Sequence, residues 1–108
     1  MIARIWHGIT PRSKADEYLA FLLERAIPDY QSIPGNLGVQ ILRREEGDET
    51  HFLTLTHWSS EEAIRAFAGE DISVAKYYPE DVHFLLAFEP TVQHFRVFPE
   101  ALVPATAG

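Results

Sequence analysis

Residues that could do chemistry recur at alternate positions along four segments with the composition of β-strands. Their side chains include an imidazole that can accept a proton, guanidinium groups that can hold an anion, and aromatic rings that can hold a flat molecule. This mixed set consists of Arg4, Trp6, Gly8, Gln40, Leu42, Arg44, Phe52, Thr54, Thr56, Trp58, His94, Arg96 and Phe98. Trp58 ends its segment directly before a helix start signal, so it could pack the end of a core or form the wall of a pocket.

The composition of the chain is that of one acidic globular domain. Its 108 residues, 46% of them hydrophobic and 23% charged, are enough for a single core. The net charge of -7 argues against a nucleic-acid or anionic-membrane partner, because partners of the same sign repel. The absence of cysteine excludes disulfides, thiolate catalysis and cysteine metal sites, and it fits a cytoplasmic protein. No two of the five histidines have the i, i+4 spacing of a helical zinc site, so we expect no metal.

Four strands are predicted from runs of β-branched and aromatic residues, at residues 2–10, 37–44, 51–58 and 91–98. The first carries one arginine and no long apolar stretch, so we expect neither a signal peptide nor a membrane span there. Gly47 centres a turn that joins the second and third strands in a hairpin. The proline- and alanine-rich residues 99–108 are predicted to form an irregular C-terminal tail.

The first predicted helix covers residues 14–31, where apolar side chains recur at helical spacing. Ser13 is its expected N-cap, and Pro28 is expected to kink or end its last turns. The second predicted helix begins at a capping box formed by Ser59 and Glu62.

This second helix is expected to run to about Phe67, and residues 71–88 to form one or two short helical pieces broken near Pro79. The order of elements is β-α-β-β-α-β. It predicts that residues 1–98 form a single ferredoxin-like α+β domain with a four-stranded antiparallel sheet.

The positions that alternate with the mixed set are nearly all aliphatic. This aliphatic set consists of Ala3, Ile5, His7, Ile9, Leu37, Val39, Ile41, Leu53, Leu55, His57, Phe95 and Val97. Periodicity alone places the aliphatic set under the helices and the mixed set in water. The mixed set is too aromatic for a wet face, however, and two helices cannot cover both faces of one sheet. A second copy of the chain can cover one of them, so we expect a homodimer.

Three stretches resemble the antibiotic biosynthesis monooxygenase family of dimeric α+β barrels. They are PGNLGVQIL, which leads into the second strand, FLTLTHWSSEEAIRAFAG, in which a strand ends in Trp58 before a helix, and AKYYPEDVHFLLAFEPTVQHF, which is similar to an uncharacterised bacterial branch. The resemblance covers residues 2–98. It implies that the aliphatic set meets the sheet of a partner subunit. The mixed set then meets the chain's own helices and lines a small-molecule cleft.

Members of this family with a known activity oxidise electron-rich phenols or hydroquinones with O2 and without a prosthetic group. The resemblance therefore implies no cofactor, and a cleft that binds a small aromatic molecule, removes a proton and stabilises an oxyanion. It implies His94 as the base and Arg96 or Arg4 as the anion stabiliser. The substrate-binding residues it implies are Arg4, Trp6, Gln40, Phe52, Thr54, Trp58 and Tyr78, the last from the segment that covers the cleft.

Each of these residues also has an ordinary structural interpretation. Large aromatics dominate protein cores, strand histidines are commonly neutral and hydrogen bonded, and arginines on neighbouring strands can pair with helix carboxylates. A barrel that binds a hydrophobic molecule without chemistry, as in a stress response, and a cleft filled by its own side chains are therefore alternatives. A heme-degrading branch of similar folds uses asparagine, tryptophan and histidine at positions that correspond to Trp6, Phe67 and Tyr77, so we expect no histidine ligand for heme there.

Overall fold

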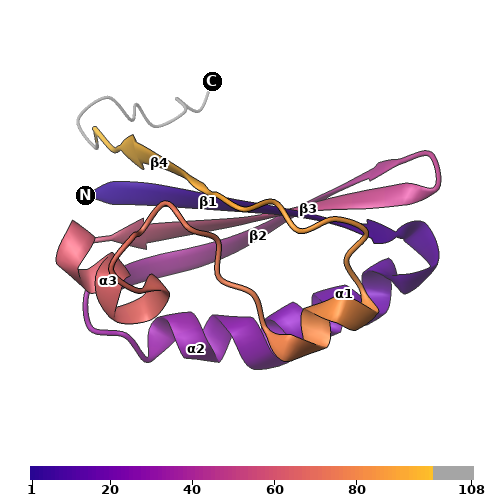
Figure 1. Cartoon of the computed structure of the whole chain (residues 1–108), viewed down its shortest axis with the longest axis horizontal. Coiled ribbons are helices and arrows are strands. Elements are labelled where there is room, and N and C mark those ends of the chain that lie inside the picture. The colour runs from indigo at the N-terminus through magenta and orange to yellow at the C-terminus, as the bar shows by residue number, and fades with distance from the viewer. Residues whose placement is uncertain (99–108) are drawn as a thin grey trace, which may run out of the picture.

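The computed structural model describes residues 1–98 and shows a four-stranded antiparallel sheet with helices on one side (Figure 1). The strands are β1 Ile2–Pro11, β2 Asn36–Glu46, β3 Glu49–Trp58 and β4 Gln93–Arg96, in the order β2-β3-β1-β4. This is the predicted ferredoxin-like arrangement. The prediction for residues 99–108 lies outside the described residues. No helix within residues 1–98 is long and apolar enough to cross a membrane.

The first helical run joins β1 to β2 and buries one continuous face. It consists of η1 Arg12–Lys14, α1 Ala15–Phe21, the π-helical turn η2 Leu22–Ala26 and α2 Ile27–Gln31. Four residues at four-residue steps are buried, as the helical spacing predicts: Tyr18, Leu22, Ala26 and Tyr30. Such steps drift by ~40° each around a regular α-helix, and the wider π-helical turn reduces that drift.

One prediction about the ends of this run is wrong, and one is met. Ser13 does not cap the helix, because it lies inside the 3-10 turn η1 through which the chain enters α1. The helix ends at Gln31, the last residue of its predicted range, in the turn that contains Pro28. Pro28 follows the π-helical turn and stands in the first turn of α2, where its missing N–H removes no bond of that helix.

The turn between β2 and β3 fixes the register of the hairpin. The pairing of Glu46 with Glu49 leaves only Gly47 and Asp48 as turn residues. Gly47 has a φ of 62°, which a glycine adopts without strain and which the first position of a type II′ hairpin turn requires. A two-residue turn leaves no freedom to slide one strand along the other.

This register reverses the predicted faces of β2. Val39 and Ile41 lie opposite Thr56 and Thr54, and therefore face the helices, while the other side carries Gln40, Leu42 and Arg44. The family resemblance implied that Val39 and Ile41 face away from the helices with Leu53 and Leu55, and that placement is wrong in β2. The placement expected from periodicity alone is met there, because a slip of one residue exchanges the two faces of a strand. Gln40 is exposed on the side away from the helices, so its prediction as a cleft residue is wrong.

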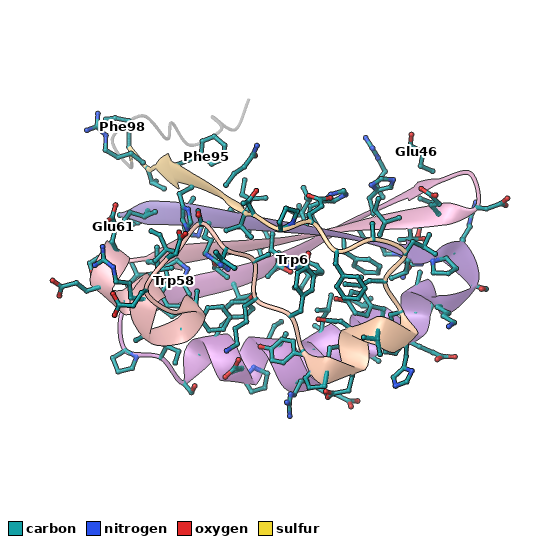
Figure 2. The ribbon with its side chains drawn as sticks, in the orientation of Figure 1. Trp6, Glu46, Trp58, Glu61, Phe95 and Phe98 are labelled. Atoms are coloured by element: carbon teal, nitrogen blue, oxygen red, sulfur yellow. The ribbon has the colours of Figure 1, made fainter. Side chains whose placement is uncertain are left out.

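In the other three strands the mixed set lies between the sheet and the helices. Arg4 pairs with Thr56 on one neighbouring strand and with His94 on the other, so these three side chains share the helix side. Figure 2 shows Trp6 and Trp58 on that side, whereas Phe95 points away from the helices. The placement implied by the family resemblance is confirmed here, and the placement expected from periodicity alone is wrong.

The chain after β3 completes the cover over the sheet. It forms α3 Glu61–Ala68, an extended segment, the 3-10 turn η3 Pro79–His83 and the return to β4. Between residues 71 and 88 only η3 is helical, and it begins at the predicted break. An isolated β-bridge between Val74 and Thr91 ties the outgoing part of this cover segment, residues 69–92, to its returning part.

The helix α3 is capped by Ser60, one residue beyond the predicted Ser59. The Ser60 hydroxyl accepts a hydrogen bond from the Ala63 N–H at 3.2 Å. We expect Ser60→Ala to lower the free energy of unfolding by about 1 kcal/mol, because an N-cap acceptor is lost. Ser59→Ala is the matched control, and equilibrium urea unfolding of both variants is the measurement. An equal loss from both would show that the cap is not the cause.

Candidate functional site

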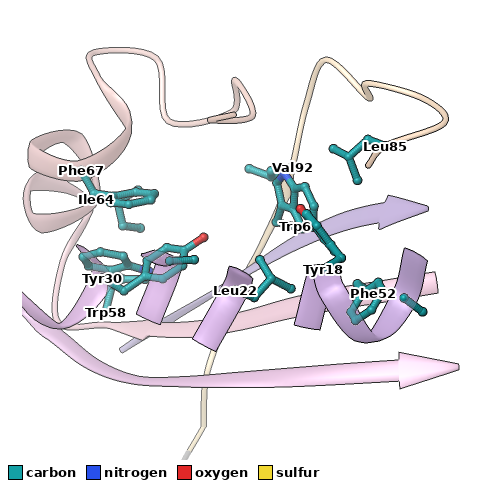
Figure 3. Packing of buried hydrophobic residues seen from close by; sticks show 12 residues of the cluster. Trp6, Tyr18, Leu22, Tyr30, Phe52, Trp58, Ile64, Phe67, Leu85 and Val92 are labelled. Atoms are coloured by element: carbon teal, nitrogen blue, oxygen red, sulfur yellow. The ribbon is translucent and has the colours of Figure 1, made fainter. Parts of the chain in front are cut away.

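A small cavity lies between the sheet and the first helical run, where the resemblance implies a cleft. Its volume is about 10 Å³, which is room for about one water molecule. Its lining comes from the sheet, the helical run and the cover segment, and consists of Trp6, Thr54, Tyr18, Leu22, Ala26, Tyr30, Lys76, Tyr78 and Asp81. Figure 3 shows Trp6, Tyr18 and Leu22 gathered on the helix side of the sheet. Four of these nine side chains are aromatic, which suits a flat ligand.

Gly8 lets the indole of Trp6 lie beside the cavity. A Cβ atom at Gly8 would lie 2.3 Å from Cη2 of Trp6 and 3.1 Å from Cδ2 of Leu85, so a larger residue would push the ring aside. Trp6 also meets Tyr77 edge to face, with ring centroids 6.0 Å apart. The Nε1 atom of Trp6 is buried and has no hydrogen-bond partner within residues 1–98.

Asp81 is a buried carboxyl group in the wall of the cavity, with 1% of its surface exposed. Its Oδ1 accepts a hydrogen bond from the Tyr18 hydroxyl at 3.0 Å, and its Oδ2 accepts one from the Tyr78 N–H at 2.7 Å. Burial raises the pKa of Asp81, although the bonds from Tyr78 and Tyr18 oppose the rise. A carboxylate with a raised pKa is a better proton acceptor than an exposed one.

Lys76 and Tyr78 separate the cavity from a larger depression on the surface. This depression of about 590 Å³ is lined by Glu24, Arg25, Pro28, Asp29, Lys76, Tyr77, Tyr78 and Pro79. The Tyr78 hydroxyl donates to Oδ2 of Asp29 at 2.5 Å, and the Lys76 ammonium lies 3.4 Å from the same oxygen. Burial and the bond to Asp29 raise the pKa of Tyr78, so the phenol stays protonated and keeps donating. We call this group of three side chains the Asp29 cluster.

Arg4 lies on the helix side of the sheet, between the levels of the two tryptophans. Its side chain is 1% exposed, its Nη2 donates to the Val74 carbonyl at 3.1 Å, and its guanidinium faces the Phe67 ring at 5.7 Å. Burial lowers the pKa of Arg4, and burial together with the Arg4 charge lowers the pKa of His94. Nε of Arg4 and Nε2 of His94 are both buried without a partner within residues 1–98.

The structure brings only part of the predicted site to the cavity. Trp6, Thr54 and Tyr78 line it, and Arg4 and His94 lie on the same side of the sheet. Phe52 and Trp58 are fully buried in the core but are not part of the lining. Arg96 is exposed at the edge of the sheet, where its guanidinium lies over the Phe98 ring at 4.6 Å.

Sequence reasoning missed Asp81 and Lys76. A signal for Asp81 exists, because an acidic residue two positions after Pro79 is typical of the first turn of a helix, where its carboxylate bonds to backbone N–H groups. Lys76 lies in an extended segment without periodicity, and nothing in its sequence context predicts that it reaches Asp29, which is 47 residues away along the chain.

The side of the sheet away from the helices carries stacked histidines. Nε2 of His7 and Nδ1 of His51 are 2.9 Å apart with ring planes 13° from parallel, and Glu89 bonds to the other nitrogen of His7. Two grooves of about 220 and 330 Å³ lie beside His7, and no tryptophan, tyrosine or phenylalanine lines either of them. Within residues 1–98 no group of three or more histidine, aspartate or glutamate side chains could hold a metal ion. The cavity under the helices is therefore the better candidate for a flat organic ligand.

Residues 7–75 match the sequence profile of the antibiotic biosynthesis monooxygenase family. A heme oxygenase (mycobilin-producing) of Mycobacterium tuberculosis is 47% identical over 39 residues, which are 36% of this chain. The match spans 36% of the length of that curated relative.

Solved structures of similar proteins share the fold of this chain. The heme-degrader MhuD from Mycobacterium tuberculosis, with two hemes bound in its active site, is 26% identical, and the match covers 97% of this chain and 100% of that one with a TM-score of 0.61. An antibiotic biosynthesis monooxygenase, 16% identical, matches in fold with a TM-score of 0.65 over 92% of this chain and 100% of that one. Because the profile match extends from β1 through α3 into the cover segment, the chain belongs to the antibiotic biosynthesis monooxygenase family.

Proposed function

We propose that the protein is a monooxygenase that oxidises a small phenol or hydroquinone with O2, without a prosthetic group, at the cavity between the sheet and the helices. The observation that carries this proposal is the buried carboxyl of Asp81 in a wall of aromatic rings. Family membership supports oxygenation in general, and this lining supports an aromatic substrate. A base of raised pKa that is shielded from water is what deprotonation of a phenol requires.

The proposed reaction balances without a further reductant. Asp81 accepts the hydroxyl proton, and the electron-rich ring then gives electrons to O2 and forms a carbon–oxygen bond para to the phenolate oxygen. Loss of water from the resulting hydroperoxide leaves a second carbonyl, so that phenol plus O2 becomes para-quinone plus H2O. The ring loses four electrons, and both oxygen atoms of O2 are reduced. A hydroquinone becomes a hydroxyquinone by the same stoichiometry.

His94 and Arg4 keep proposed roles in this scheme. His94 lies on the cavity side of the sheet as a neutral imidazole, because its pKa is lowered, and we propose that it donates a hydrogen bond to the substrate rather than acting as the base. Arg4 holds the anion, since it is the buried guanidinium on that side. The role of Arg96 as the alternative anion stabiliser stays a prediction, and its side chain is exposed.

Substrate reaches the cavity by displacing the Asp29 cluster. The cavity has room for about one water molecule, so a six-membered ring needs Tyr78 or the cover segment to move. The surface depression lies directly outside, and Lys76 and Tyr78 line both spaces. Their hydrogen bonds to Asp29 are the contacts that opening must break.

Heme, which the relatives bind, does not fit the residues at this site. The lining contains no histidine. The resemblance implies Tyr77 at the place of a heme ligand, and the Tyr77 hydroxyl donates to the Glu89 carbonyl at 2.5 Å. A porphyrin also needs a pocket of several hundred Å³. We therefore propose no step that involves heme.

Oxygen uptake with a panel of phenols and hydroquinones tests the proposal. We expect an active member of the panel to give a product that has gained one oxygen atom and lost two hydrogens, with that oxygen derived from 18O2 in mass spectra. Heat-denatured protein controls for autoxidation. No enzyme-dependent uptake across the panel would overturn the proposal. A Soret shift on titration with hemin, followed by hemin loss with ascorbate, would replace the phenol by heme as the substrate.

Binding without chemistry is the second candidate function, because the aromatic side chains of the lining can hold a flat ligand whether or not it reacts. Ligands that raise the melting temperature of the protein without forming any product would support it.

We also propose that the protein acts as a homodimer in the cytoplasm. The dimer is proposed because the side of the sheet away from the helices exposes 41% of Leu42 and 50% of Phe95. A monomer in sedimentation equilibrium at micromolar concentration would contradict the dimer.

A further inference from the structure

The guanidinium of Arg4 is a buried charge without a counter-ion. Within residues 1–98 no carboxylate forms an ion pair with it, although eight acidic side chains do pair with other residues: Asp16, Asp29, Glu45, Glu46, Glu49, Glu61, Glu80 and Glu89. The Val74 carbonyl accepts a hydrogen bond from Nη2 of Arg4, and Nε of Arg4 has no acceptor within residues 1–98. A buried cation is costly unless an anion accompanies it.

Two further buried nitrogens without partners flank this charge. His94 stands directly opposite Arg4 in the β1–β4 pair, and Trp6 lies two residues along β1 on the same side of the sheet. Arg4, Trp6 and His94 therefore carry three unpartnered nitrogens, Nε, Nε1 and Nε2, at neighbouring positions on the helix side of the sheet. Buried nitrogens in native proteins usually have partners, and three neighbouring exceptions point to a ligand that supplies acceptors.

This region adjoins the cavity. The Arg4 charge acts on the Tyr30 hydroxyl, and Arg4 and Lys76 both lie over the ring of Phe67, at 5.7 and 4.1 Å from its centroid. Tyr30, Lys76 and Trp6 all line the cavity. A ligand whose ring occupies the cavity could thus extend an acidic group toward Arg4.

We propose that the ligand of this site is an aromatic acid, whose carboxylate is bound by Arg4 with His94 as a second donor and whose ring lies in the cavity beside Trp6. This inference rests on the proposed function, because it names the class of phenol that is oxidised. Arg4 supplies a planar pair of donors that matches the two oxygens of a carboxylate. The net charge of the chain is -7, so general attraction to anions cannot produce a preference for the acid.

The test compares 2,5-dihydroxybenzoate with the neutral 2,5-dihydroxybenzamide under nitrogen, where binding occurs without turnover. Calorimetric titration of the wild-type protein is expected to give a dissociation constant at least about tenfold lower for the acid, the size of a hydrogen-bonded charge pair. Arg4→Met is expected to abolish this preference, because it lowers the affinity for the acid far more than the affinity for the amide. Arg65→Met, which removes an exposed arginine from α3, is the matched control and should keep the preference.

A thermal melt separates the binding role of Arg4 from a structural one. Arg4→Met should melt at the same temperature as the wild-type protein or higher, because it removes an uncompensated buried charge. A large drop in melting temperature would mean that Arg4 is retained for stability. If that variant does not fold, Arg4→Lys, which keeps the charge but loses the planar donors, should lose most of the preference for the acid.

The outcomes also distinguish this inference from the proposed function. Equal affinity of the wild-type protein for the acid and the amide overturns the inference, even if neutral phenols are oxidised. A preference for the acid that disappears in Arg4→Met supports it, even if no phenol consumes O2.

Discussion

Asp81→Asn is expected to lower kcat/KM for phenol oxidation by about 10²- to 10⁴-fold, the usual contribution of a general base. The asparagine keeps the shape of the side chain but cannot accept the phenolic proton. We expect the rate of the wild-type enzyme to rise with pH as Asp81 ionises, since the carboxylate is the active form. The variant should lose this dependence.

The substitution is designed to preserve the hydrogen bonds of Asp81. The amide oxygen can accept the Tyr78 N–H, and the amide nitrogen can donate to the Tyr18 hydroxyl once that hydroxyl rotates to accept. Both partners stay bonded, and η3 keeps its first-turn contact. A loss of activity would then report the missing charge rather than a rearranged cover segment.

Asp81 is also expected to make the free energy of unfolding depend on pH. The pKa of Asp81 in the folded protein is raised above its ordinary 3.8 by burial, so the folded protein binds this proton more tightly than the unfolded chain does. The contribution of Asp81 to stability is therefore full below pH 3.8 and falls as the pH rises through the raised pKa. Urea unfolding at several pH values should show a smaller fall for Asp81→Asn.

Glu80→Gln is the matched control for both measurements. It removes the neighbouring carboxylate of η3, which lies 3.9 Å from Arg25 on the surface rather than in the cavity. Its kcat/KM on the high-pH plateau should match that of the wild-type enzyme. Its rate should still rise with pH, with a midpoint shifted slightly to lower pH, because the Glu80 charge adds a minor part to the raised pKa of Asp81. If Asp81→Asn keeps full activity, another group accepts the proton, and His94→Ala becomes the informative variant.

The fold could be predicted from the sequence more completely than the candidate site could. Alternation separates two sets of side chains in β1, β3 and β4, but it cannot say which set meets the helices, and hydrophobicity alone chose wrongly. In β2 the aliphatic side chains do face the helices, and the two-residue turn at Gly47 and Asp48 sets this register. That turn is readable in the sequence, so the exposed position of Gln40 could have been predicted from hairpin geometry.

The chemistry of the site depends on contacts that sequence patterns do not contain. Tyr18 and Asp81 are 63 residues apart, and Tyr78 and Asp29 are 49 apart, yet each pair is joined by a hydrogen bond. No periodicity links a helix to an irregular segment across such a distance. Arg4 was recognisable as a basic residue in an aromatic set, but its missing counter-ion is visible only once the surrounding residues are in place.

Trp58→Ala is expected to lower the free energy of unfolding by about 3–5 kcal/mol, because it empties a large volume in the centre of the core. Trp58 is fully buried, packs against Tyr30 and Phe67 with ring centroids 6.4 and 5.7 Å away, and donates its indole N–H to Thr56 at 2.8 Å. It does not line the cavity, so packing is its role.

Substitution of each tryptophan by phenylalanine separates packing from binding. Trp58→Phe keeps most of the ring and should lose about 1–3 kcal/mol of stability, since the hydrogen bond to Thr56 disappears, with KM unchanged. Trp6→Phe removes no hydrogen bond, because the Nε1 of Trp6 has no partner within residues 1–98, but it enlarges the cavity and should change KM. Urea unfolding and steady-state kinetics on both variants are the measurements. A change in KM for Trp58→Phe, with none for Trp6→Phe, would place the aromatic wall of the binding site at the end of β3 instead of beside Gly8, and the assignment of the cavity would have to be abandoned.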